Sequence, residues 1–109
     1  MGIDNSHLRS FRIKIDDEMQ TQITDELRNN NVDKQQLVSD AADWFVGQRV
    51  IGALPPRYFA SPHNANYECL WVKRETAQRL HKIAESDGTK ASRVLYTALA
   101  RYIENLKEV

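Results

Sequence analysis

A strand without a partner is the strongest constraint in this sequence. Residues 10–16, SFRIKID, alternate polar and apolar side chains without a break, so in an extended chain they point alternately to two sides. The apolar side holds Phe11, Ile13 and Ile15, and the polar side holds Ser10, Arg12 and Lys14. A single strand cannot pair its own backbone amides and carbonyls, so the segment requires a second strand.

The rest of the chain offers one more strand and four amphipathic helices. The aromatic and branched residues of YECLWVK, residues 67–73, predict a strand. Apolar stripes with helical spacing predict helices over 17–31, 33–47, 74–87 and 90–107. The element order is therefore strand–helix–helix, a connector, and strand–helix–helix again. Matching order and lengths indicate a degenerate internal repeat.

Local signals set the expected helix ends. The run of asparagines at 29–31 ends the first helix, because Asn tolerates a left-handed cap. Asp33 with Gln36 resembles a capping box at the start of the second helix, and Gly47 is expected to end it. Gly88 suits a left-handed stop before the last helix.

Each half alone buries too little apolar surface to be stable, since it has only about 43 residues. If two strands pair antiparallel and four helices interlock, each strand gains a hydrogen-bonding partner and the halves together bury enough apolar surface. The expected fold is mainly α with short β-ribbons. We expect a first repeat over 1–47, with 1–9 as a flexible N-terminal arm, a connector over 48–66 and a second repeat over 67–109.

Composition argues against several function classes. The single cysteine excludes an internal disulfide and a cysteine-cluster metal site. No phosphate-binding glycine loop, Ser/His/Asp set or placed carboxylate pair is present, so we expect no enzyme, cofactor or metal. No apolar run reaches the ~20 residues of a membrane span, and the N-terminus lacks the apolar core of a signal peptide. A cytoplasmic protein is expected.

Two segments carry a family resemblance. SFRIKIDDEM runs an alternating strand directly into an acidic helix start, and AESDGTKASRVLYTAL spaces Gly88, Ser92, Leu95 and Ala98 across a turn and a second helix. Over residues 9–47 and 67–107 the chain resembles the ribbon-helix-helix family, the Arc- and MetJ-like DNA-binding proteins. The resemblance implies that a two-stranded ribbon enters the major groove of double-stranded DNA.

The resemblance also implies roles for individual residues. Base contacts would come from Ser10, Arg12 and Lys14, and phosphate contacts at helix starts from Lys34, Thr89 and Lys90. Arg12 is the best candidate for a bidentate contact to guanine, because a planar guanidinium matches the two acceptors of that base. Asp33 would oppose a phosphate at the start of the second helix.

The second strand departs from this pattern. By alignment with the first repeat its outward residues are Tyr67, Cys69 and Trp71, and a register shifted by one would turn Glu68, Leu70 and Val72 outward instead. Neither face is cationic. An exposed apolar row costs solubility, so we expect a cover over it, either the connector segment VIGALPPRYF or a partner protein. Direct contact of this face with DNA is the alternative.

Two assemblies are compatible with the sequence. The two halves of one chain can pair with each other, as tandem family members of conjugative plasmids do by resemblance. Alternatively, each strand pairs with its own copy in a second chain, giving a homodimer or higher oligomer. We favour the second arrangement, because like pairing with like explains the different character of the two strands.

The leading functional hypothesis is a sequence-specific repressor of bacterial, plasmid or phage origin, associated with the nucleoid. The alternative is a protein-interaction module, namely a conjugation (relaxosome) accessory factor or an antitoxin-like protein.

Overall fold

The structure, a computed structural model, describes residues 7–107. These residues form a mixed α/β fold with four helices and one two-stranded antiparallel sheet. In chain order the elements are β1 (Leu8–Ile15), α1 (Asp17–Asn30), α2 (Lys34–Val50), β2 (Asn66–Lys73), α3 (Arg74–Ser86) and α4 (Ala91–Lys107).

The missing partner of β1 is β2 of the same chain. The two strands run antiparallel, with Ser10 opposite Trp71 and Arg12 opposite Cys69. The preferred prediction of pairing between identical strands of two chains was therefore wrong, and the alternative within one chain is the one observed. One chain completes its own ribbon because the connector is long enough to bring β2 back beside β1.

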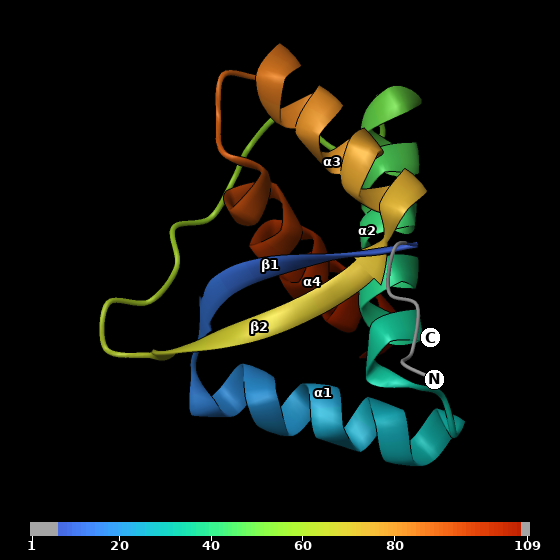
Figure 1. The fold of residues 1–109 in the computed structure, drawn as a ribbon, viewed down its shortest axis with the longest axis vertical. Coiled ribbons are helices and arrows are strands. Elements are labelled where there is room, and N and C mark those ends of the chain that lie inside the picture. Colours follow the sequence, from blue (N-terminus) through green and yellow to red (C-terminus); the bar gives the residue numbers. More distant parts are fainter. Residues whose placement is uncertain (1–6, 108–109) are drawn as a thin grey trace.

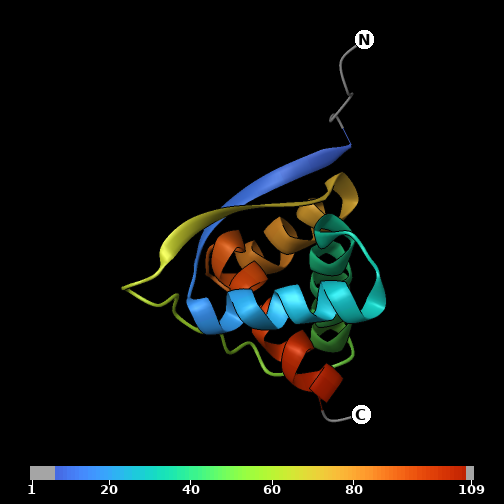
Figure 2. The ribbon, with the colours of Figure 1, turned by 90° about the horizontal axis from the view of Figure 1, so that it is seen from below.

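All four helices lie on one side of this ribbon (Figures 1 and 2). In Figure 1, α1 lies below the ribbon and α3 above it, while α2 and α4 lie behind the strands. Figure 2 shows the strands along one edge of the molecule and the helices beneath them. One face of the ribbon is thereby covered, and the opposite face is left to solvent.

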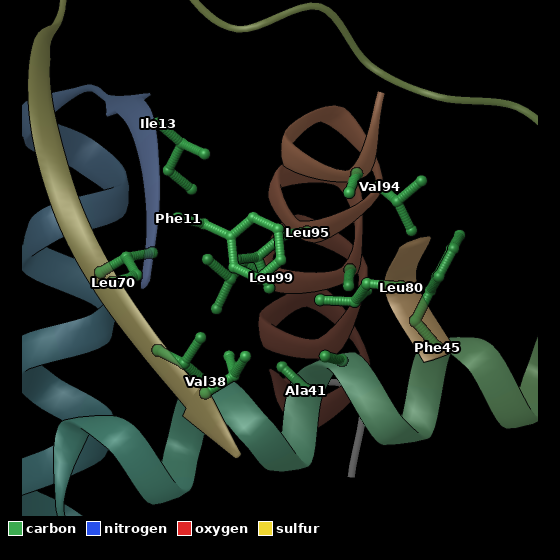
Figure 3. Close-up of a cluster of buried hydrophobic side chains, with 14 of the residues drawn as sticks. Phe11, Ile13, Val38, Ala41, Phe45, Leu70, Leu80, Val94, Leu95 and Leu99 are labelled. Carbon is green, nitrogen blue, oxygen red and sulfur yellow. The ribbon is translucent and has the colours of Figure 1, made fainter. Parts of the chain in front are cut away.

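A single hydrophobic core joins both halves of the chain. Inward residues of both strands meet residues of the helices in it (Figure 3), namely Phe11, Ile13, Val38, Ala41, Phe45, Leu70, Leu80, Val94, Leu95 and Leu99. Leu95 and Leu99 of α4 are fully buried at its centre. Because each half supplies one side of this core, neither half has a complete core of its own.

The helix ends follow the sequence signals with two exceptions. The Asp16 carboxylate caps α1 by accepting a hydrogen bond from the Met19 amide at 2.9 Å, and Asn31 adopts the predicted left-handed conformation after it. The expected capping box at α2 is absent, because Asp33 makes no side-chain cap and Gln36 bonds Asp40 instead.

The second exception is the end of α2. The helix continues past Gly47 to Val50, so the connector between the elements is residues 51–65. Gly47 is exposed and nothing lies near its missing side chain, so it costs the helix only its intrinsic propensity. At the N-terminus, residues 1–6 of the expected flexible arm lie outside the described residues, and Leu8 and Arg9 belong to β1.

Corresponding helices of the two halves begin at one constant spacing. Helices α1 and α3 begin at residues 17 and 74, and α2 and α4 begin at residues 34 and 91, so both pairs are 57 residues apart. The left-handed residues Asn31 (φ 51°) and Gly88 (φ 68°) have the same spacing. At that spacing Arg12 corresponds to Cys69, which lies directly opposite it in the ribbon.

The connector is fastened to the helices by a polar cluster. The Tyr58 hydroxyl and the Arg49 guanidinium both donate to the Asp87 carboxylate, the latter at 2.9 Å. The hydrogen bond from Tyr58, followed by that from Arg49, outweighs desolvation and lowers the pKa of Asp87 below its ordinary value of 3.8. Further along, the Phe59 amide donates to the Thr97 hydroxyl of α4 at 2.9 Å.

Replacing Asp87 by asparagine should destabilise the fold at pH 7 by about 1–3 kcal/mol, since two donors lose their charged acceptor. A carboxyl whose pKa is lowered by folding stabilises the protein above its unfolded pKa and loses that effect as pH falls through the folded pKa. The difference between the original chain and Asp87→Asn should therefore shrink as the pH falls below 3.8 and through the lowered pKa of Asp87. Thermal unfolding across this pH series measures it. Asp25→Asn, at an exposed position of α1, is the matched control and should show no such difference.

Candidate nucleic-acid interface

The solvent side of the ribbon carries the six residues that the sequence placed there. Outward-facing side chains alternate along both strands, and we call Ser10, Arg12, Lys14, Tyr67, Cys69 and Trp71 the outer ribbon face. Tyr67 is 55% exposed and Trp71 is 42% exposed, while Lys14 is half-buried. The predicted face is confirmed because Phe11, Ile13, Leu70 and Val72 turn into the core, and the shifted register of β2 with Leu70 and Val72 outside is wrong.

Tyr67 organises the two cations of β1. The guanidinium carbon of Arg12 lies 4.4 Å from the centre of the Tyr67 ring, and the Lys14 ammonium nitrogen lies 5.2 Å from it. Both distances fall within the range of cation–π attraction. A guanidinium stacked on a ring keeps its N–H donors in its own plane, where a base or phosphate can reach them.

Acidic side chains are kept away from this face. The strands contain one carboxylate, Glu68, which is half-buried on the helix side and accepts a hydrogen bond from Gln20 of α1 at 2.8 Å. Within residues 7–107, Arg12 and Lys14 form no ion pair. Their positive charge is therefore available to an anionic ligand.

A cationic hollow adjoins one end of the outer ribbon face. It has a volume of about 320 Å³ and opens between the ribbon, connector residues 60–63 and the start of α4. Four basic side chains line it: Arg12, Lys14, Lys90 and Arg93. The start of α4 adds the positive end of a 17-residue helix. The hollow thus gathers charge that is scattered in the sequence.

The predicted phosphate-contact residues occupy different places. Lys90 is exposed in the cationic hollow, and Thr89 is half-buried in the turn before α4. Lys34 begins α2, which packs against β2, and it does not line the hollow. The structure therefore brings Lys90, and not Lys34, together with Arg12 and Lys14.

Two further exposed cations were not among the predicted contact residues. Arg93 lies in the first turn of α4 and lines the cationic hollow. Lys73 is exposed at the end of β2, opposite Leu8. The alternation that selected Tyr67 and Trp71 includes Lys73 as the next outward residue, so the signal was present in the sequence. Arg93 had no such signal, because the turn before α4 brings it to the ribbon.

The connector does not cover the outer ribbon face as expected. Leu54 and Tyr58 pack against the core on the helix side, and the Arg101 guanidinium lies 4.9 Å from the Phe59 ring centre. The connector runs along the helices before it turns into β2 (Figure 1). Its apolar segments VIGAL and RYF were predicted to pack on something, and this is confirmed for Leu54 and Tyr58 on the α2–α4 side of the core but wrong for Val50 and Ile51, which are exposed.

A second surface is apolar. A groove of about 730 Å³ lies between α2 and α3 and is lined in part by Val46, Ile83 and the end of α2. Val50 and Ile51 are 77% and 73% exposed there. Among residues 7–107, the four most exposed large apolar side chains lie at these two surfaces. Val50 and Ile51 lie at this groove, and Tyr67 and Trp71 lie on the outer ribbon face.

Comparison with protein-family models, with curated proteins and with solved structures found no match to this chain. Within residues 7–107, no helix has the length and apolar character to cross a membrane, and no cluster of His, Cys, Asp or Glu is arranged to hold a metal ion.

Proposed function

We propose that this protein binds double-stranded DNA in a sequence-specific manner by inserting the β1–β2 ribbon into the major groove, and that it acts as a transcriptional repressor. The observation that carries the proposal is the outer ribbon face, where exposed Arg12 and half-buried Lys14 both lie against the Tyr67 ring and no carboxylate lies among the six residues. A two-stranded antiparallel ribbon has the width that the major groove admits.

The proposal describes the protein as two ribbon-helix-helix repeats in one chain. Its support is the constant spacing of 57 residues between corresponding helices and between the left-handed residues Asn31 and Gly88. Corresponding core positions are also occupied alike, since Ile13 and Leu70 are both buried at that spacing. Strand pairing within the chain supports the tandem arrangement.

The length of the outer ribbon face limits what it can read. From Ser10 to Lys14 a strand rises by roughly 13 Å, which corresponds to roughly four base pairs. In this footprint Arg12 would pair with the O6 and N7 acceptors of a guanine, and Trp71 would contact a thymine methyl group. Ser10 and Lys14 contribute hydrogen bonds at the two ends.

The cationic hollow has a separate role in the proposal. Lys90 and Arg93, with the first amides of α4, would hold a phosphate of the backbone beside the groove. Contacts of this kind fix the register of the ribbon on the duplex, whereas the base contacts supply the sequence preference. A helix start aimed at a phosphate therefore complements the readers on the strand.

Salt dependence tests whether binding is electrostatic in this way. We expect the affinity for a random-sequence duplex of about 20 base pairs to fall steeply between about 50 and 200 mM salt, because phosphate contacts release counterions. Lys90→Ala should reduce the slope of log K against log[salt] by about 0.9, the effect of one lost contact. Fluorescence anisotropy measures both slopes.

Lys82→Ala is the matched control for that experiment. Lys82 is an exposed lysine on α3 that lines the apolar groove and not the cationic hollow. An equal change of slope in both variants would show that Lys90 acts only through net charge. Absence of binding to any duplex would contradict the proposed function.

A second candidate function is that of a conjugation (relaxosome) accessory factor, which would bind DNA and a protein partner together. The observation that favours it is the exposed apolar pair Val50 and Ile51 on the surface away from the ribbon. Replacing both by aspartate should abolish partner binding and leave the affinity for duplex DNA unchanged. Light scattering with and without duplex gives the mass of each complex and therefore the number of chains that it contains.

A further inference from the structure

The two ends of the outer ribbon face differ in charge. Arg12 sits at the middle of the ribbon, opposite Cys69, but its guanidinium lies over Tyr67. Tyr67 is the residue opposite Lys14, so both cations gather at the same end. The other end presents Trp71 opposite Ser10, and the exposed cations there, Arg9, Lys73 and Arg74, lie beyond the six residues of the outer ribbon face.

The starts of α4 and α2, which correspond to each other, also differ in charge. Each cation of the hollow can be compared with the residue 57 positions away, the spacing that relates α1 to α3 and α2 to α4. None of these counterparts is basic and one is acidic: Arg12 corresponds to Cys69, Lys14 to Trp71, Lys90 to Asp33 and Arg93 to Gln36. Asp33 is exposed and makes no side-chain cap, so its carboxylate would repel a phosphate at the start of α2.

We propose that one chain binds duplex DNA in a single orientation and recognises a site that lacks two-fold symmetry, with a phosphate held at the start of α4 and none at the start of α2. This inference rests on the proposed function and specifies the class of DNA site. The backbone of the ribbon is close to two-fold symmetric about the pair Arg12–Cys69. Side chains alone remove the symmetry, so the bound sequence should contain one guanine for Arg12 and no symmetric counterpart.

Each end of the ribbon favours a different kind of base pair. Arg12 and Lys14 favour guanine at the Tyr67 end, since both present donors to its two acceptors. Trp71 has an apolar ring at the other end and favours the methyl group of thymine. Reversing the chain on the same sequence would bring Trp71 to the guanine and Asp33 to the phosphate that Lys90 had held.

Selection from a random library tests the inference. The full chain is incubated with duplexes whose central 12 base pairs are random, the bound duplexes are sequenced, and light scattering gives the number of chains in each complex. We expect an enriched motif without two-fold symmetry in a complex with one chain per duplex. Phosphate ethylation interference should show the phosphate contact of the start of α4 on one side of the motif and no contact at the two-fold related position.

A variant that equalises the strands provides the matched comparison. Tyr67→Ser, Cys69→Arg and Trp71→Lys together give β2 the outward residues of β1 in the same order. All three positions are exposed, so the thermal midpoint should change by only a few degrees. We expect the motif selected by this triple variant to gain two-fold symmetry.

The outcomes separate this inference from the proposed function. A motif that is two-fold symmetric within the footprint of one unaltered chain would overturn the inference while leaving DNA binding intact. Selection of the same asymmetric motif by the triple variant would overturn it as well, because the outer side chains would then not set the asymmetry. Failure to enrich or bind any duplex would instead refute the proposed function, and the inference with it.

Discussion

Replacing Arg12 by alanine is expected to weaken binding to the selected duplex by about 5- to 150-fold, corresponding to about 1–3 kcal/mol for a bidentate contact to a base. Binding to random duplex should change far less, because the contact that is removed is to a base and not to a phosphate. Arg12 has this large effect because it lies at the centre of the ribbon and is organised by Tyr67. Anisotropy titrations with both duplexes measure the ratio of the two affinities.

Arg28→Ala is the matched control for Arg12→Ala. Arg28 is an exposed arginine in the last turn of α1, remote in sequence from both strands. This variant carries the same change of charge and should bind both duplexes nearly as the unaltered chain does. If Arg12→Ala lowers both affinities by the same factor, Arg12 contributes charge only, and base reading by this residue is contradicted.

Replacing Phe45 by alanine is expected to cost about 3–5 kcal/mol of unfolding free energy. The Phe45 ring is 1% exposed in the shared core and packs edge-on against Tyr58, with 5.9 Å between ring centres. The change therefore opens a cavity and loosens the connector at once. Because the free energy of unfolding of a small domain is only about 5–15 kcal/mol, the variant should be marginally stable at 25 °C.

Two further variants keep this prediction testable. Phe45→Leu retains most of the buried volume, so it should still fold and should lose less unfolding free energy than Phe45→Ala. Val50→Ala removes a side chain that is 77% exposed and should change stability by less than about 0.5 kcal/mol. Urea unfolding of all three variants gives the comparison. A loss below about 1 kcal/mol for Phe45→Ala would show that α2 and the connector are not packed as described.

Most of the fold could be predicted from local sequence patterns. The alternation of SFRIKID predicted which side chains of β1 face solvent, because the period of two is a property of the strand itself. The outward residues of β2 were predicted from its alignment with the first repeat. The turns at Asn31 and Gly88 were equally predictable from residues that tolerate positive φ. Each of these inferences depends on neighbours within a few positions in the sequence.

Strand pairing could not be predicted in the same way. The argument that like pairs with like weighed side-chain character, but backbone hydrogen bonding and the shared core decide which strands meet. Leu70 and Val72 complete the same core as Phe11 and Ile13 when β2 lies beside β1. A polar outer residue opposite an aromatic one is tolerated because that face is solvated.

The connector and the cationic hollow were missed for a related reason. Arg49, Tyr58 and Asp87 lie far apart in the sequence, and their hydrogen bonds exist only once the helices have packed. This cluster carries the connector along the helices instead of over the ribbon. Arg93 joins Arg12 through the same packing, since α4 contacts β1.

Because β1 pairs with β2 of the same chain, the ribbon does not dissociate when the protein is diluted. A ribbon built from two chains falls apart when its concentration drops below the dissociation constant of the dimer. Here the second strand is tethered to the first, so its effective local concentration stays fixed however few molecules a cell contains. Each strand is also encoded separately, so a mutation in one is not copied into the other. Cys69 could therefore come to stand opposite Arg12 without a second cysteine replacing the arginine.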